Sequence, residues 1–158
     1  MNMLDKLQQI HSDEKPKIVD INKSTMPLFK HHINKVLTLE AEIKKMEQVR
    51  CPVKHHFAPG IYAREIIMPA GAVITGKIHK YAHMNIISKG CVTFTDETGT
   101  RTVQAPYTFR SNAGSKKALF IHQETVWTTI HPTDETDVEK IEAEVVTENI
   151  EDLICLGG

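Results

Sequence analysis

Between residues 52 and 131, short runs of β-branched and aromatic residues alternate with turn residues, as at 59–60, 69–71 and 112–115. Because no helix-length segment interrupts these runs, the pattern disfavours strands and helices alternating around a parallel sheet. The spacing, about seven or eight strands in roughly eighty residues, predicts a small antiparallel β-barrel or jelly roll. The expected strands cover 61–68, 73–79, 83–88, 91–95, 100–104, 108–111, 118–122 and 125–131.

The residues on either side of this all-β core predict helices. We expect a short helix at 28–37, a break before it at Met26-Pro27, and a second helix that begins at Thr38 as N-cap and ends near Arg50. Acidic residues at 134, 135 and 137 would lie in the first turn of a helix over 134–146, where they favour the helix dipole. The chain thus divides into an N-terminal helical extension at 1–51, a β-barrel at 52–132, and an acidic C-terminal helix and tail at 133–158.

The composition fits one domain and argues against several classes of protein. The chain has 158 residues, of which 41% are hydrophobic, and lacks an apolar run of about 18 residues that could span a membrane. Its first residues lack the apolar stretch of a signal peptide, and its three scattered cysteines suit a reducing compartment, so we expect a cytoplasmic protein. Residues 51–131 hold nine Lys and Arg against four Asp and Glu, an excess too small to indicate nucleic-acid binding.

The strongest candidates for a site are His79 and His83, in the middle of the β core. Lys77 lies two residues before His79, so both side chains should share one face of the predicted strand. Two imidazoles held in this way can bind a metal ion or orient a polar ligand. The side chains that we expect to meet in the barrel mouth and bind the ligand are Arg64, Lys77, His79, His83, Asn85 and Lys117.

The glycine and histidine spacing in residues 71–90 resembles the first motif of the cupins, which are small antiparallel β-barrels. On this resemblance, His79 takes the place of the second motif histidine, His83 that of the glutamate, and Lys77 that of the first histidine. In the second motif, which corresponds to residues 112–117, Lys117 replaces the histidine. A protonated lysine repels a cation instead of binding it. This pattern therefore favours the binding of an anion over the binding of a metal by the four ligands usual in the family.

Three further phrases resemble small single-domain cupins that tailed bacteriophages encode. These are the residues at 57–65, 75–79 and 126–135. Since the group has no settled activity, the resemblance implies a fold, a phage source and a location in the host cytoplasm, rather than a reaction.

Three functions follow as hypotheses. The first is the binding of a small polar or anionic molecule in the barrel mouth, such as a host metabolite. The second is a metal-dependent enzyme of the oxygenase or isomerase type, in which His79, His83 and a third imidazole hold a divalent transition metal. The third is a structural module that pairs into a homodimer without a ligand. A plainer interpretation, that both histidines are hydrogen-bonded core residues, also stays open at this point.

Four other residues bear on these hypotheses. His55 and His56 precede the first expected strand, and one of them could turn inward as the third imidazole, although edge positions are the usual place for adjacent histidines. Trp127, the only tryptophan, is expected to be a packing anchor against an end helix or a partner chain. His131 shares a strand face with Trp127, so we expect it to lie outside the site.

Overall fold

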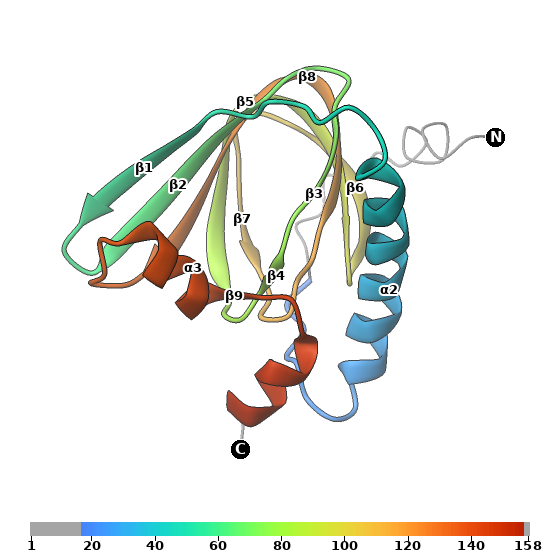
Figure 1. Cartoon of the computed structure of the whole chain (residues 1–158), viewed down its shortest axis with the longest axis vertical. Helices are drawn as coiled ribbons and strands as arrows, with labels where there is room; N and C mark the ends of the chain where they lie inside the picture. Colours follow the sequence, from blue (N-terminus) through green and yellow to red (C-terminus); the bar gives the residue numbers. More distant parts are fainter. Residues whose placement is uncertain (1–16, 157–158) are drawn as a thin grey trace.

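The computed structural model describes residues 17–156, and its core is an antiparallel sheet (Figure 1). The main path runs β1-β2-β8-β5-β6, with β3 paired to β8 and β7 paired to β5. The bounds are β1 Val53–Ala58, β2 Ile61–Met68, β3 Val73–Thr75, β5 His83–Asp96, β6 Gly99–Gln104, β7 Tyr107–Ser111 and β8 Ala118–Pro132. The predicted all-β core with flanking helices is confirmed. Among the described residues the path has two ends, at β1 and β6, so the sheet does not close on itself, which is consistent with the jelly-roll form of the prediction.

Two long strands replace four of the short ones that the sequence predicts. The expected strands at 83–88 and 91–95 are one strand, β5, and those at 118–122 and 125–131 are one strand, β8. Gly90 lies at an irregularity of the β5–β8 pairing with φ of 95°, so it marks a bulge rather than a turn. A Cβ at Gly90 would come within 2.4 Å of the Glu124 carbonyl oxygen, so only glycine fits.

The predicted strand at 73–79 breaks in two. β3 ends at Thr75 and stays on the main sheet, whereas β4, Ile78–His79, pairs with β9, Val146–Thr147, in the C-terminal segment. This separate two-stranded pairing carries His79 away from the sheet that holds β3. Residues 53–58, which we did not predict as a strand, form β1 and pair along their whole length with β2.

The helices differ from the prediction in number and bounds. A single helix, α2 Met26–Ile43, replaces the two expected at 28–37 and 38–50. Pro27 lies in its first turn, where a proline is tolerated, and Thr38 lies in its interior and donates to the Asn34 carbonyl oxygen at 3.0 Å. Helix α3, Val138–Val145, begins after Asp137, whose carboxylate accepts from the amides of Glu139 and Lys140. Thus the acidic residues expected in its first turn precede the helix, and Asp137 is its N-cap.

Three apolar clusters hold these elements together. The largest lies inside the sheet, around Phe94, Phe109 and Trp127. A second joins α2 to β4 and to the 3₁₀ helix η1, Ile150–Leu156, through residues such as Phe29, Ile78 and Leu153. A third packs α3 on β2, where Tyr62 contacts Ile141 and Val145. The C-terminal segment is therefore fixed against β2 through α3, and against β4 through β9 and η1.

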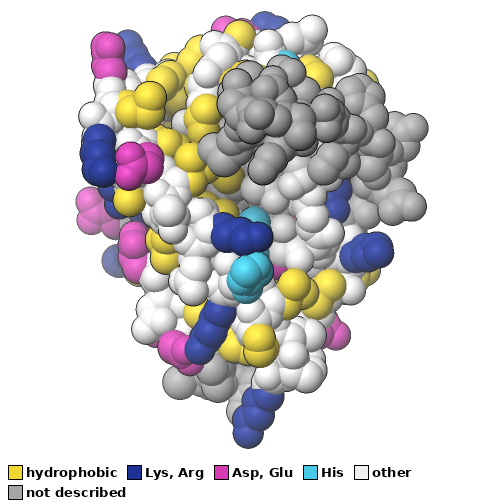
Figure 2. All heavy atoms as spheres, turned by 90° about the vertical axis from the view of Figure 1, so that its right-hand side faces the viewer, with side chains coloured by type: hydrophobic (Ala, Val, Ile, Leu, Met, Phe, Trp, Pro, Cys, Tyr) yellow, Lys and Arg dark blue, Asp and Glu magenta, His cyan; other side chains and the backbone are white. Residues whose placement is uncertain are grey.

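The described surface next to α2 is mixed in character. Figure 2 shows lysine and arginine side chains scattered among acidic and apolar ones on this face, rather than gathered in one patch. Within residues 17–156, none of the helices is both long and apolar enough to cross a membrane.

Candidate functional site

A cavity of about 280 Å³ lies between the sheet and the C-terminal segment. Side chains of β2, β3, β5 and β8 form its walls, and α3 and β9 cover it from the C-terminal side. Its apolar part is built by residues such as Ile66, Met68, Leu119 and Trp127, and its polar part contains histidines, a lysine and an arginine. An apolar cavity with a few convergent polar groups is the usual form of a small-molecule site.

Three histidines meet at the polar end of this cavity. His79 lies on β4, His83 begins β5, and His131 is near the end of β8. Their ring centroids are 4.1 Å apart for His79 and His83, 4.8 Å for His83 and His131, and 5.3 Å for His79 and His131. One ring nitrogen from each histidine lies within 4.8 Å of the other two. The sequence predicted two of these three rings.

The strand pairing explains this meeting. Met84 of β5 pairs with Ile130 of β8, so His83 and His131 come next to each other at the end of that ladder. His79 reaches them because its backbone pairs with Val146 and also donates to the Ser115 carbonyl oxygen at 3.1 Å. The ring of His79 is therefore held in place by β9, a strand far along the chain from β4.

Burial keeps all three rings neutral. It lowers the pKa of His83 to about 3, an effect that the nearby Lys117 charge increases, and lowers the pKa of His131 to about 4. The pKa of His79 also falls well below its usual value, mainly through burial and then through His83 and Lys117. At neutral pH each ring thus keeps one unprotonated nitrogen, which is the form that binds metals.

The hydrogen bonds of the rings leave nitrogen atoms available. Nδ1 of His83 donates to the Tyr81 carbonyl oxygen at 3.0 Å, since a carbonyl can only accept, so the lone pair of His83 is on Nε2. Among the residues that the structure describes, the buried Nδ1 atoms of His79 and His131 have no hydrogen-bond partner. Buried polar atoms are rarely left unpaired, so the interpretation of the histidines as fully hydrogen-bonded core residues does not fit.

The three nitrogens match the ligand set of a transition metal. Nitrogens that bind one zinc ion tetrahedrally at 2.0–2.1 Å lie about 3.4 Å from each other. The separation of up to 4.8 Å observed here needs only small ring movements to reach that spacing. The backbone hydrogen bond of His83 orients its ring in the manner typical of metal-binding histidines.

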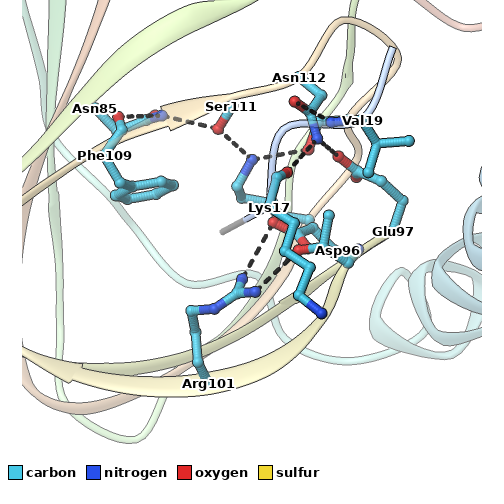
Figure 3. Close-up of polar contacts among 12 residues, drawn as sticks. Lys17, Val19, Asn85, Asp96, Glu97, Arg101, Phe109, Ser111 and Asn112 are labelled. Atoms are coloured by element: carbon cyan, nitrogen blue, oxygen red, sulfur yellow. Dashed lines mark hydrogen bonds and ion pairs between the residues drawn. The ribbon is translucent and has the colours of Figure 1, made fainter. Parts of the chain in front are cut away.

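Lys117 lies in the wall of the same cavity and is buried. Its ammonium donates to Oγ of Ser111 at 2.7 Å and to Oγ of Ser115 at 2.9 Å. Ser111 Oγ also accepts from Nδ2 of Asn85 at 2.8 Å, a contact drawn in Figure 3, and Asn85 Oδ1 accepts from Trp127 Nε1 at 3.0 Å. This chain of contacts fixes the lysine and the tryptophan on adjoining parts of the cavity wall.

A second polar cluster lies on the far side of Lys117. In Figure 3, Asn112 donates to Glu97 and to the Lys17 carbonyl oxygen, and its own side-chain oxygen accepts from the Val19 amide. Arg101 and Asp96 form a buried ion pair beside them, with 3.5 Å between nitrogen and oxygen. These groups hold residues 17–19 against the sheet and form no part of the cavity wall.

The remaining predicted site residues fall into two groups. Arg64 lines the cavity on the β2 face that also carries Tyr62 and Ile66. Lys77 also borders it, but its side chain is 56% exposed and lies 3.9 Å from the Glu142 carboxylate, so it stands at the rim and does not share a strand face with His79. The reason is that the strand breaks after Thr75, which ends the alternation that the sequence analysis assumed.

Neither His55 nor His56 supplies the third imidazole. Nδ1 of His55 lies 2.6 Å from the Tyr62 hydroxyl, and His56 lies on the exposed side of β1, 3.3 Å from Glu65. His131 occupies the site instead, and Trp127 faces the core rather than an end helix or a partner. The shared strand face of Trp127 and His131 was visible in the sequence, but we assigned that face to the outside.

The comparisons with known proteins find distant structural likenesses and no activity. No protein-family model matches the chain, and no curated protein matches it.

Several of the similar solved structures are cupins. A cupin superfamily protein from Desulfitobacterium hafniense has a TM-score of 0.47 at 9% identity and covers 56% of this chain and 83% of its own. A cupin domain from Bordetella pertussis has a TM-score of 0.43 at 14% identity, covering 56% and 98%. KdgF from Halomonas sp. has a TM-score of 0.46 at 14% identity, covering 55% and 86%.

Because these TM-scores are below 0.5 and the identities are low, no ligand or reaction is transferred from those proteins to this chain.

Proposed function

We propose that this chain binds a divalent transition metal through His79, His83 and His131, and that the metal and the cavity together hold a small polar or anionic molecule. The observation that supports this most directly is the cluster of three neutral, buried imidazoles with one nitrogen each within 4.8 Å of the others. The unpaired Nδ1 atoms of His79 and His131 would gain a partner in such a complex.

The donor set favours particular metals. Three imidazoles suit zinc, iron, cobalt, nickel or copper, whereas magnesium and calcium prefer oxygen ligands. With three protein ligands, a coordination position stays open toward the cavity, which is the arrangement of catalytic rather than structural zinc sites. When bound, the metal would supply Lewis-acid polarisation of a carbonyl or activation of a bound water.

The side chains of the chain itself would bind and orient the ligand. Arg64 and Lys117 place positive charge around the polar end, and the apolar wall around Met68, Leu119 and Trp127 excludes water from the rest of the cavity. The lysine charge opposes a cation nearby, which weakens metal binding unless an anion binds with it. The site therefore favours metal and anion together over metal alone.

Metal analysis of the purified full chain tests this proposal. The chain would be expressed with supplemented zinc, iron, cobalt or nickel, and we expect close to one equivalent of one metal per chain. Addition of Co²⁺ to chelator-treated protein should give the visible absorption bands of a nitrogen-rich, low-symmetry site. Less than about a tenth of an equivalent of every transition metal, with no cobalt spectrum, would contradict the proposal.

A metal-free binding protein is the second candidate, and the buried ammonium of Lys117 in the cavity wall favours it. In that case His79, His83 and His131 would serve as hydrogen-bond donors and acceptors to the ligand. Ligand binding that persists unchanged after chelation would select this candidate. An oxygenase or isomerase reaction, a phage source, a host metabolite as ligand, a cytoplasmic location and a homodimer stay predictions of the sequence resemblance.

A further inference from the structure

The cavity wall contains the buried ammonium of Lys117, which has one N–H donor left for a ligand. From this group we infer that the ligand is a short-chain carboxylate. Its carboxylate group would contact the Lys117 ammonium, and its apolar chain would pack against Met68, Leu119 and Trp127. This inference rests on the proposed function, because it assumes that the cavity beside the three histidines is the binding site.

Lys117 lacks a counter-charge in contact with it. Its side chain is buried, and none of the carboxylates that the structure describes lies within ion-pair distance of its ammonium. Burial lowers the pKa of Lys117, whereas Asp96 and Glu97 favour its charged form from farther away, and the Phe109 ring lies 5.9 Å from Nζ. A buried charge without a partner is costly, so an anion that contacts it gains more than it would at the surface.

The hydrogen bonds of Lys117 leave room for one more. An ammonium has three N–H donors, and Ser111 and Ser115 accept two of them. Because Ser111 also accepts from Asn85, the lysine cannot turn away without breaking this chain of contacts. The third donor is available to a ligand oxygen in the cavity that Lys117 lines together with His79 and His83.

The charges around the cavity favour an anion. Its lining carries three cationic side chains, Arg64, Lys77 and Lys117, against one carboxylate, Glu142, which lies 3.9 Å from Lys77 at the rim. That rim pair leaves Arg64 and Lys117 as the cations of the described wall that have no carboxylate in ion-pair contact. A phosphate group usually needs more N–H donors, such as a helix N-terminus, which the described lining does not offer.

The volume and polarity of the cavity limit the size and chemistry of the rest of the ligand. A volume of about 280 Å³ corresponds to roughly nine water molecules, so a compact ligand of about ten non-hydrogen atoms fits. The wall opposite the histidines is formed by Ile66, Met68, Ile74, Leu119 and Trp127, none of which carries a charge. A chain of a few methylene groups on the carboxylate would bury its surface there.

Calorimetry on the full chain with a series of small probes tests the inference. The probes are acetate, butyrate and hexanoate, with butanol, butylammonium and butyl phosphate as matched compounds of other charge. We expect affinity to rise roughly threefold to fourfold with each methylene up to the length that the cavity admits. Butyrate should bind at least about tenfold more tightly than butanol or butyl phosphate. Equal affinity for butanol and butyrate, or tighter binding of butyl phosphate, overturns the inference.

Two lysine variants test whether the carboxylate group of the ligand binds to Lys117. Lys117→Met should reduce butyrate affinity at least about tenfold, whereas Lys89→Met, on the same sheet but exposed and paired with Glu124, should leave it unchanged. Equal butyrate affinity in both variants overturns the assignment to Lys117. If Lys117→Met does not fold, the probe series on the unmodified chain still decides the ligand class.

The same measurements, made with and without bound metal, separate this inference from the proposed function. Metal binding without carboxylate preference contradicts only the inference, and carboxylate preference in a chain that binds no metal contradicts only the metal site.

Discussion

The rings of His83 and His131 lie with their centroids 4.8 Å apart, although one residue begins β5 and the other lies near the end of β8. The pairing of Met84 with Ile130 fixes this relationship through backbone hydrogen bonds. Since His79 joins them from the short β4–β9 pair, the candidate metal site depends on two separate sheets. The consequences of this arrangement can be tested residue by residue.

Replacement of His131 by alanine should reduce metal affinity at least about 100-fold, because it removes one of three ligands. Even the loss of a residue that only orients a ligand typically reduces metal affinity about 10–100-fold. The measurement is competition with a chromophoric chelator for Zn²⁺ or Co²⁺. His31→Ala is the matched control, since His31 is an exposed histidine on α2. Similar affinities of the two variants would rule out His131 as a ligand.

The metal-free chain should lose stability as the pH falls from about 6.5 to 4. In the unfolded chain a histidine takes up a proton near pH 6.5, whereas in the folded chain the pKa of His83 is about 3 and that of His131 about 4. The unfolded state therefore binds more protons over this range, so the stabilising effect present above pH 6.5 is lost progressively on acidification. Urea denaturation at pH 7, 5.5 and 4 measures this loss of stability.

The free energy of unfolding should fall by several kcal/mol across that range, and the fall should be smaller in His83→Gln. Because carboxylates also titrate near pH 4, the difference between the two proteins is the quantity to compare. An identical pH dependence in both would show that His83 is not held neutral by burial.

Substitution of Gly90 by alanine should destabilise the fold by at least about 3 kcal/mol. Its φ of 95° strains any other residue, and its Cβ would also lie 2.4 Å from the Glu124 carbonyl oxygen in the facing strand. Gly71→Ala is the control, because Gly71 has a φ of 84° but nothing within 4 Å of the added Cβ. We expect Gly71→Ala to lose about 1 kcal/mol of stability, and chemical denaturation of both variants should reveal the difference.

Asn85→Ala should cost about 2–4 kcal/mol of stability. The change leaves the Trp127 indole N–H without its buried acceptor, removes one of the two hydrogen bonds that Ser111 Oγ accepts, and opens a small cavity. Since Trp127 is the only tryptophan, its fluorescence should also shift to the red in this variant. Asn34→Ala, on the exposed side of α2, should change neither stability nor emission. Unchanged emission in Asn85→Ala would mean that Asn85 does not fix the indole.

Much of the β core could be predicted from local sequence, because turn residues and β-branched runs act over a few positions. The errors came where one strand continued through a glycine, as at Gly90, and where a strand broke without a turn signal, as after Thr75. In both places the decisive contacts are with distant residues, Glu124 at the bulge and Val146 beside His79. Helix bounds failed for a similar reason, since Thr38 carries a capping side chain but α2 continues through it to Ile43, and Glu40 beyond it pairs with the distant Lys116 at 3.3 Å.

The sequence by itself determined that this chain forms an antiparallel β core and that His79 and His83 belong to one polar site. These conclusions depend on strand spacing and on residue types, which are local properties. Only the tertiary structure decided that His131 completes the site, that Lys77 turns to Glu142 at the rim, and that Trp127 faces inward. A strand with apolar and polar residues on both faces can present either face to the core, and that choice is made by the strands and helices that pack against it.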